Sequence, residues 1–211
     1  MIIGKLAGIW RYPVKSLRGE ALEAASVFAD GLEGDRRKAL IVTGGHARQG
    51  KTYRGKEHNE LHLLDDAREA IRRAALRNVD TRIDDEHEHY FDDAPVSILV
   101  DRWLVELRAH AGFAVEPERF RPNFFIEAVP GFTADEAALT GRELALGEVR
   151  LRVRYPIERC VTTTYDQTTG ESNTEILRFV AEHRSAWMGI YCDVLRAGTA
   201  RIGDSLTLAE R

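Results

Sequence analysis

The segment "ERCVTTTYDQTTG", residues 158–170, concentrates residue types that can do chemistry. Its single cysteine, Cys160, precedes three consecutive threonines and stands six residues before Asp166. A thiolate is both a nucleophile and a soft metal ligand, and threonine hydroxyls can bind a polar ligand beside it. A lone cysteine in a threonine-rich strand is also a common core residue, so the segment by itself leaves both interpretations open.

The neighbours of the thiol depend on the local backbone. If a regular strand runs through this segment, alternate side chains share a face. Thr162 and Thr164 would then lie on the face of Cys160, and Arg159 and Thr163 on the other. The pattern therefore predicts Thr162 as a closer partner of the sulfur than Arg159.

Basic residues elsewhere in the chain are candidates for an anion site. In "RPNFF", Pro122 favours an extended Arg121, so Arg121 and Asn123 are predicted to face one side and bind a phosphate or a heterocycle. An Asx turn with a surface salt bridge is the alternative. Further candidates are Lys15 and Ser16 after a proline-ended strand, the cations of "GDRRK" at Gly34, and the loop residues Arg48, Lys51, Arg54 and Lys56. They predict a local phosphate pocket, unless they form an ordinary solvated face.

The elements that must position these residues are mostly short strands. Strands are predicted at 2–12, 22–28, 38–43, 123–129, 143–155 and 189–210, and "TGGH" at 43–46 predicts a type I′ hairpin turn at Gly44 and Gly45. Helical periodicity covers 62–78, 101–112, where Gly112 is the expected C-cap, and 174–183. The pattern predicts a predominantly β, barrel-like α+β fold and lacks the motifs of a doubly wound nucleotide-binding sheet.

Composition limits the function classes. The chain has 211 residues, 44% of them hydrophobic and 30% charged, and a net charge of −4, so neither nucleic acid nor an anionic membrane is an expected partner. The N-terminal residues lack a signal-peptide layout, and a cytoplasmic location is expected. Cys160 and Cys192 form no Cys-x-x-Cys pair and are expected as free thiols. For His58, His62, His87 and His89, loop positions are favoured over metal binding.

Several motifs together resemble one known family. In chain order they are "YPVKSLRGE", "GDRRKALIV", "ARQ", "RPNFFIE", "LGEVRLRVRYPIERCVTTTYDQTTG" and "GIYCDVLRAGTARIGDSLTL". Their succession across nearly the whole chain resembles the MOSC family, named for the C-terminal domain of the molybdenum cofactor sulfurase. The family includes the mitochondrial amidoxime-reducing components.

The resemblance implies a MOSC-type β-barrel with two or three flanking helices. It is expected as a single unit over 1–211, with an N-terminal β portion with one helix over 1–95 and a core with the cysteine motif over 96–211. It also implies a molybdenum cofactor, with Cys160 as ligand of the metal and Cys160 and Asp166 as catalytic residues. The implied cofactor-binding residues are Lys15, Ser16, Arg36, Arg48, Arg121, Asn123, Thr162 and Thr163.

The leading functional hypothesis is an oxidoreductase that reduces N-hydroxylated or similar N–O or S–O substrates. The sequence carries no fused iron–sulfur module, so this hypothesis requires a separate electron-donor protein as well as a small-molecule substrate. The alternatives are a sulfur carrier or transferase that uses a Cys160 persulfide, a non-catalytic carrier of the cofactor, and a small-anion binding module.

Overall fold

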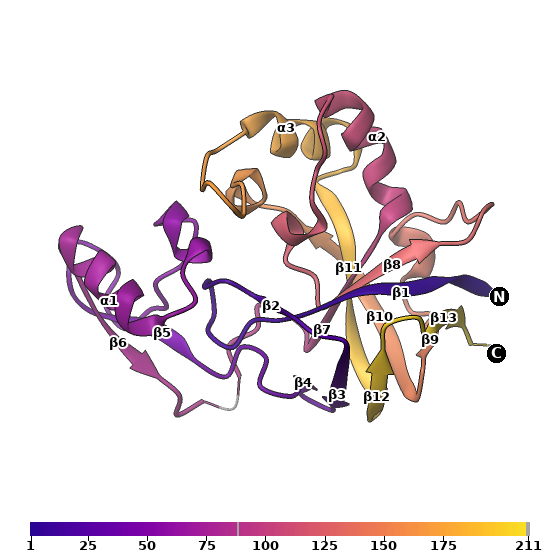
Figure 1. Cartoon of the computed structure of the whole chain (residues 1–211), viewed down its shortest axis with the longest axis horizontal. Coiled ribbons are helices and arrows are strands. Elements are labelled where there is room, and N and C mark those ends of the chain that lie inside the picture. Colours follow the sequence, from indigo (N-terminus) through magenta and orange to yellow (C-terminus); the bar gives the residue numbers. More distant parts are fainter. Residues whose placement is uncertain (88, 210–211) are drawn as a thin grey trace.

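The computed structural model describes residues 1–87 and 89–209, and a closed β-barrel forms its centre (Figure 1). The barrel strands follow one another in the order β13-β9-β10-β11-β7-β8-β1, and β13 closes the ring by pairing with β1. Their bounds are Ile2–Arg11 (β1), Val96–Val100 (β7), Phe124–Ala128 (β8), Glu143–Leu146 (β9), Val149–Glu158 (β10), Trp187–Arg196 (β11) and Ser205–Leu208 (β13). The predicted barrel-type, predominantly β fold is confirmed.

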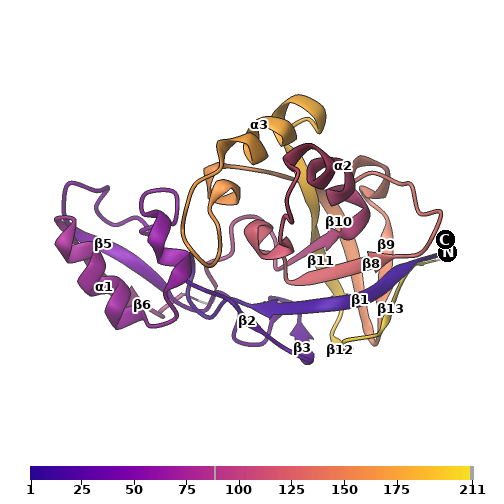
Figure 2. The ribbon, with the colours of Figure 1, turned by 45° about the horizontal axis from the view of Figure 1, so that its top comes forward.

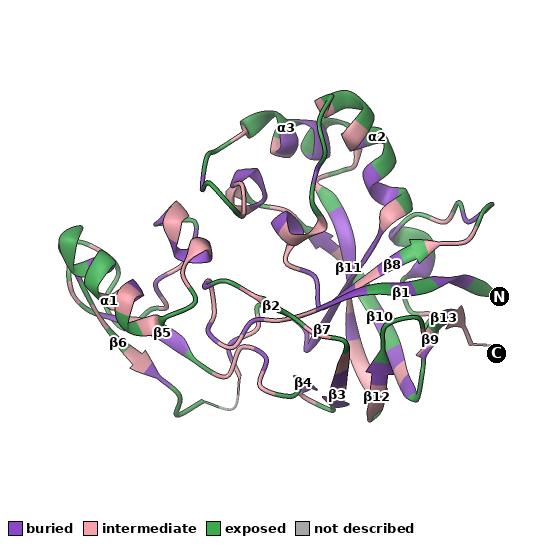
Figure 3. Cartoon of the chain, in the orientation of Figure 1, coloured by how far each residue is buried: buried purple, intermediate pink, exposed green. Residues whose placement is uncertain are grey.

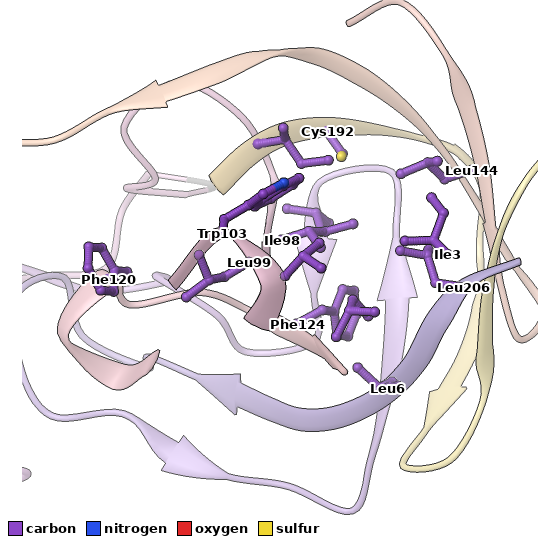
Figure 4. Packing of buried hydrophobic residues seen from close by; sticks show 14 of the residues in the cluster. Ile3, Leu6, Ile98, Leu99, Trp103, Phe120, Phe124, Leu144, Cys192 and Leu206 are labelled. Atoms are coloured by element: carbon purple, nitrogen blue, oxygen red, sulfur yellow. The ribbon is translucent and has the colours of Figure 1, made fainter. Parts of the chain in front are cut away.

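The sequence of β10 explains how the barrel buries its core. Val149, Leu151 and Val153 are buried, whereas Arg152 and Arg154 between and after them are exposed. Because strand side chains alternate between two faces, one face of β10 supplies apolar residues to the interior and the other stays in water. Figure 4 shows that this interior gathers side chains from distant parts of the chain, among them Ile3, Phe124 and Leu206.

Strand β7 is covered on both faces. All five of its residues are buried, and it pairs in parallel with β8. The connection between these two strands is helix α2, Asp101–Ala111, which buries Trp103, Leu104 and Leu107. Helix α2 ends at Gly112 with φ of 69°, as predicted. Helix α3, Thr174–His183, also lies where it was predicted and packs beside α2 (Figures 1 and 2).

A separate N-terminal lobe, residues 39–84, stands beside the barrel (Figures 1 and 2). It consists of β5 (Ala39–Gly45), a 3₁₀ turn η1 (Asn59–Leu63), helix α1 (Ala67–Leu76) and β6 (Val79–Asp84), with β5 and β6 antiparallel. The predicted helix over 62–78 is thus divided, because Asp66 caps a new helix by accepting from the Arg68 N–H. The lobe has its own apolar cluster around Leu40 and Leu61, which Val14 and Leu17 complete.

The remaining strands are short. A three-stranded sheet contains β3 (Ala24–Phe28), β4 (Gly31–Leu32) and β12 (Gly198–Arg201), while β2 (Glu20–Ala21) pairs with the end of β1. Figure 3 shows burial along the barrel strands and exposure on the outer sides of the helices. Across the described residues, no helix combines the length and apolarity that a membrane crossing requires.

The predicted type I′ turn at 43–46 is wrong. Gly44 and Gly45 both lie inside β5, and of the two only Gly45 has a positive φ, 85°. A Cβ atom at Gly44 would lie 2.5 Å from a carboxylate oxygen of Asp80 on β6. The two glycines therefore permit close pairing of β5 with β6, and the chain turns back later, so that Thr52 bridges to Ile41.

Candidate functional site

Cys160 lies just beyond the end of β10, and its environment is a turn rather than a strand. The residue is the N-cap of the 3₁₀ turn η4, Val161–Thr164, so the condition of a regular strand through this segment is not met. Its carbonyl oxygen accepts from the N–H and the hydroxyl of Thr163, at 3.1 and 3.0 Å. These contacts tighten the turn and leave Cys160 exposed at the surface.

Thr162 is the direct neighbour of the sulfur. Its Oγ1 atom lies 2.7 Å from the Sγ atom of Cys160. The turn, not strand alternation, produces this contact, so the expected partner is confirmed for a different reason. Thr164, predicted on the same face, instead donates to the Val161 carbonyl and contacts Ser172 in a buried position. Cys192 is a free, buried thiol on β11, and burial raises its pKa.

The thiol opens into a cavity of about 600 Å³ between the barrel and the N-terminal lobe. The predicted site residues that line it are Lys15, Ser16, Arg36, Arg121, Cys160, Thr162 and Thr163. Segments from four parts of the sequence thus meet around Cys160. The predicted residues that lie outside this lining are Arg48, Asn123 and Asp166.

Arg121 reaches the cavity in an unexpected backbone conformation. The prediction of an extended Arg121 is wrong: φ and ψ are 50° and 48°, because Arg121 is the C-cap of the 3₁₀ turn η2, Pro117–Phe120. Its guanidinium stacks over the Tyr12 ring at 4.2 Å and donates to the Leu17 carbonyl at 2.7 Å. The Nη1 atom is buried without a hydrogen-bond partner among the described residues. Burial lowers the pKa of Arg121 to about 10.

Arg36 lies on the same aromatic ring. Its guanidinium lies 4.7 Å from the centre of the Tyr12 ring, pairs with Asp35 at 2.5 Å and donates to the Arg121 carbonyl at 3.3 Å. Burial disfavours the charged form, but Asp35, Tyr12 and Asp92 together outweigh burial, and the pKa of Arg36 is raised. Lys15, at the same end of the cavity, pairs with Asp92 at 2.5 Å. Three cations thus lie close together at this end of the cavity, and two of them, Lys15 and Arg36, are paired with carboxylates.

Asn123 lies outside the cavity lining and binds the lining residue Ser97. It is buried, its Oδ1 atom accepts from the N–H and hydroxyl of Ser97 at 3.0 Å, and its Nδ2 atom donates to the Trp10 carbonyl. The expectation that Arg121 and Asn123 face one side together is wrong, because Arg121 lines the cavity whereas the buried Asn123 amide binds Ser97 and Trp10. Asn123 instead ties β1, β7 and β8 together directly behind the site.

Asp166 closes the loop that follows Cys160. Its Oδ1 atom accepts from the N–H groups of Thr168 and Thr169, both at 2.8 Å, and its Oδ2 atom pairs with Arg119 at 2.5 Å. Hydrogen bonds from Thr169 and Thr168 lower the pKa of Asp166 despite some desolvation. The nearby His62 lines the cavity, stacks on Tyr165 at 5.5 Å, and is held neutral because burial lowers its pKa to about 4.

Arg159 is a lining residue that strand alternation excluded. It donates to the Met188 carbonyl at 2.6 Å and to the Phe120 carbonyl at 2.9 Å, and its Nη2 atom is buried without a partner in the described part of the chain. Burial lowers the pKa of Arg159 to about 10. Adjacency to Cys160 was the only sequence signal for it.

Other lining residues come from three regions. The basic loop "HARQGKTYRGK" contributes Arg54, Gly55 and Lys56, whereas Arg48 and Lys51 of that loop lie outside the lining. Asp92 and Asp93 come from the segment between the lobe and β7. The strands β10 and β11 add Tyr155, Trp187 and Tyr191. Their strand positions gave no sequence signal for a site.

Two family models match most of the chain. The family described as MOSC N-terminal beta barrel domain matches residues 3–88, and the family described as MOSC domain matches residues 85–207. The mitochondrial amidoxime reducing component 2 of Macaca fascicularis and that of Homo sapiens are each 30% identical over 128 residues. The match spans 54% of this chain and 37% of each relative, so it covers little more than a third of those proteins.

A solved structure shares the fold. The YuaD protein from Bacillus subtilis superposes with a TM-score of 0.57 at 15% identity, covering 97% of this chain and 94% of that one. This likeness concerns the fold alone. The MOSC domain match, in contrast, spans residues 85–207 of 211 and includes Cys160, Arg121 and the β10–β11 pair. The chain belongs to the MOSC family.

Proposed function

We propose that this chain binds a molybdenum cofactor in the cavity and reduces N-hydroxylated or similar N–O or S–O compounds. The single observation that carries the proposal is an exposed cysteine thiol beside a cavity whose walls hold buried guanidinium N–H groups that have no partner in the part of the chain that the structure describes. Family membership supports the cofactor, and the names of the relatives, amidoxime reducing components, suggest the substrate class.

The residues present fit such a cofactor. A thiolate is a suitable ligand for a metal already bound by dithiolene sulfur, and Cys160 is the accessible thiol. The Nη1 atom of Arg121 and the Nη2 atom of Arg159 are buried donors that need acceptors, and a phosphate and a pterin edge supply them. Bound there, the cofactor would supply the two-electron chemistry of oxygen-atom removal.

The residues have distinct roles in this proposal. Cys160 holds the metal, and Thr162 orients the sulfur through its 2.7 Å contact. Lys15, Ser16, Arg36, Arg121 and Thr163 surround the anionic and pterin parts. Asn123 and Asp166 act as positioning residues, the first behind Arg121 and the second through Arg119. For Arg48, sequence resemblance remains the only support.

The reaction balances with an external electron source. Reduction of an N-hydroxylated compound breaks its N–O bond, consumes two electrons and two protons, and releases water. The electrons come from a separate donor protein in this proposal. The names of the relatives place those proteins in mitochondria, and the cytoplasmic location expected for this chain stays a prediction.

The decisive experiment measures molybdenum and pterin per protein after expression in a host that makes the cofactor. Cys160→Ala should lose most of the molybdenum, and Arg121→Ala should weaken cofactor retention by about 1–3 kcal/mol because a charge-assisted hydrogen bond is removed. Arg102→Ala, an exposed arginine of α2 that lies outside the lining, is the matched control. Unchanged molybdenum in Cys160→Ala would remove the thiol from the ligand role.

The same samples separate the alternatives. A persulfide on Cys160, detected by mass spectrometry in molybdenum-free protein, would favour the sulfur carrier. Full molybdenum occupancy without reduction of any amidoxime, N-oxide or sulfoxide by a reduced viologen dye would favour the cofactor carrier.

A further inference from the structure

Part of the cavity wall is not used by the proposed cofactor contacts, and it is aromatic. Tyr155 on β10 and Trp187 and Tyr191 on β11 line the cavity, with Tyr155 42% and Trp187 37% exposed. The Tyr155 and Tyr191 rings are 6.1 Å apart and nearly perpendicular. Large aromatic side chains left exposed inside a concave site are typical of ligand contact surfaces.

This aromatic wall adjoins the thiol. Trp187 is the register partner of Glu158, two residues before Cys160, and the Arg159 N–H donates to the Ala186 carbonyl at 2.8 Å. The strand pairing therefore fixes Trp187 beside the chain segment that carries the sulfur. A molecule bound within reach of Cys160 therefore has Trp187 next to it, and Tyr155 and Tyr191 line the same cavity further along the two strands. Burial raises the pKa of Tyr191 further above neutral pH, to about 12, so its ring carries no charge.

A loop of the N-terminal lobe, residues 54–56, approaches the thiol as well. A Cβ atom at Gly55 would lie 3.1 Å from the Cγ2 atom of Thr162, whose hydroxyl contacts the Cys160 sulfur. The glycine thus lets the loop pack against the turn η4. This contact places the flanking residues Arg54 and Lys56 on the cavity next to the cysteine.

The two cations of this loop differ in whether a carboxylate of the protein already pairs with them. Arg54 is neutralised by Glu57, which accepts from both its guanidinium and its backbone N–H. Lys56 is the one cavity-lining cation without an ion pair or hydrogen bond among residues 1–87 and 89–209. The other lining cations each bind a carboxylate or a carbonyl of the protein; they are Lys15, Arg36, Arg54, Arg119, Arg121 and Arg159.

We propose that the substrate is a planar aromatic compound with an acidic substituent. Its ring packs on Tyr155, Trp187 and Tyr191, and its anionic group pairs with the Lys56 ammonium. The inference rests on the proposed function, because it assigns a substrate class to the same cavity. An aromatic ring can pack face-on or edge-on against these exposed aromatic side chains, and a carboxylate can pair with the Lys56 ammonium.

The test compares benzamidoxime with 4-carboxybenzamidoxime on molybdenum-loaded protein, with reduced viologen as electron donor. The wild type should show a lower KM for the acid. Lys56→Gln should raise the KM for the acid about threefold more than for the neutral compound, as expected for a partly exposed ion pair. Lys51→Gln, a lysine of the same loop outside the lining, should not change this ratio. Trp187→Ala should raise both KM values about fivefold or more.

A binding measurement accompanies the kinetics. Calorimetric dissociation constants for both compounds, measured on the oxidised loaded protein, should show the same dependence on Lys56 and Trp187. The molybdenum content of Trp187→Ala should match the wild type. Molybdenum loss in that variant would assign the aromatic wall to the cofactor and overturn the ring assignment.

The outcomes distinguish this inference from the proposed function. Reduction of both amidoximes with equal KM values, insensitive to Lys56→Gln, would overturn the substrate class and leave the reductase activity standing. Binding with the expected dependence on Lys56 and Trp187, but without reduction, would support the ligand class and reject the reductase. Neither binding nor reduction of the acid would overturn the inference.

Discussion

His62 is a titratable residue that the fold keeps uncharged. It is buried beside the cavity, stacks on Tyr165 and contacts the Asp166 carbonyl at 3.2 Å. Burial lowers its pKa from the ordinary 6.5 to about 4. Between these pH values the unfolded chain binds a proton at this position that the folded chain does not bind. Acidification from about pH 6.5 to 4 should therefore destabilise the protein by up to about 3 kcal/mol through this residue.

His62→Phe tests this, because phenylalanine can keep the stack on Tyr165 and cannot titrate. Urea unfolding should show that the variant loses less free energy of unfolding between pH 7.5 and 4 than the wild type. Burial also lowers the pKa of His58, so His58 contributes to the pH dependence of the unfolding free energy in both proteins. His183 is exposed, and His183→Gln should keep the wild-type pH dependence of the unfolding free energy. The hypothesis fails if His62→Phe also keeps that pH dependence.

The sequence predicts cavity-lining residues best where the side chain itself is chemically distinctive. Cys160 stands out because a thiol among threonines is distinctive, and Lys15, Arg36 and Arg121 belong to basic motifs that resemble the family; all four line the cavity. The side-chain directions of Arg121 and Asn123 could not be predicted. They depend on a left-handed residue at a 3₁₀ C-cap, and propensity disfavours that conformation before proline.

The conformation of the loop after Cys160 is stabilised by one carboxylate, that of Asp166. Asp166 holds two backbone N–H groups of its own turn and the guanidinium of Arg119, which is 5% exposed. Asp166→Asn keeps an acceptor for the turn but removes the charge that neutralises Arg119. Because Glu116 still pairs with Arg119 at 3.2 Å, the expected loss is about 2 kcal/mol of unfolding free energy, measured in urea at pH 7.

The control for this variant is Asp65→Asn, an exposed aspartate, which should change stability by less than about 0.5 kcal/mol. A positioning role also predicts that folded Asp166→Asn retains molybdenum. Wild-type stability combined with lost molybdenum would instead indicate that Asp166 contacts the cofactor directly.

Elements with strong periodicity could be predicted, and those set by tertiary contact could not. Helices α2 and α3 and strand β10 follow from their apolar spacing. The glycines of β5 suggested a turn. Instead, because they have no Cβ atom, they let β5 pair closely with β6, which lies more than thirty residues later in the chain. Likewise, β10 ends before Cys160, where the chain begins the η4 turn.

The residues that the structure describes form two apolar clusters of unequal size. The barrel cluster includes Ile3, Leu99 and Val153, whereas the lobe cluster is small and centred on Leu61. The cavity lies where both parts meet, since the barrel supplies Cys160 and the lobe supplies the loop at Gly55. We propose that residues 1–211 work as one functional unit in which the N-terminal lobe is the less stable part.

Native-state hydrogen exchange tests this proposal. Leu61→Ala removes a fully buried side chain of the lobe and should cost about 2–4 kcal/mol, which lowers the free energy of local opening for amides of β5, β6 and α1. Amides of β7, β10 and β11 should keep most of their protection. Leu99→Ala, a fully buried residue of the barrel, should instead lower protection throughout the chain, because the lobe core requires Val14 and Leu17 held by β1. Equal loss of protection in lobe and barrel for Leu61→Ala would show a single cooperative unit and contradict the weaker lobe.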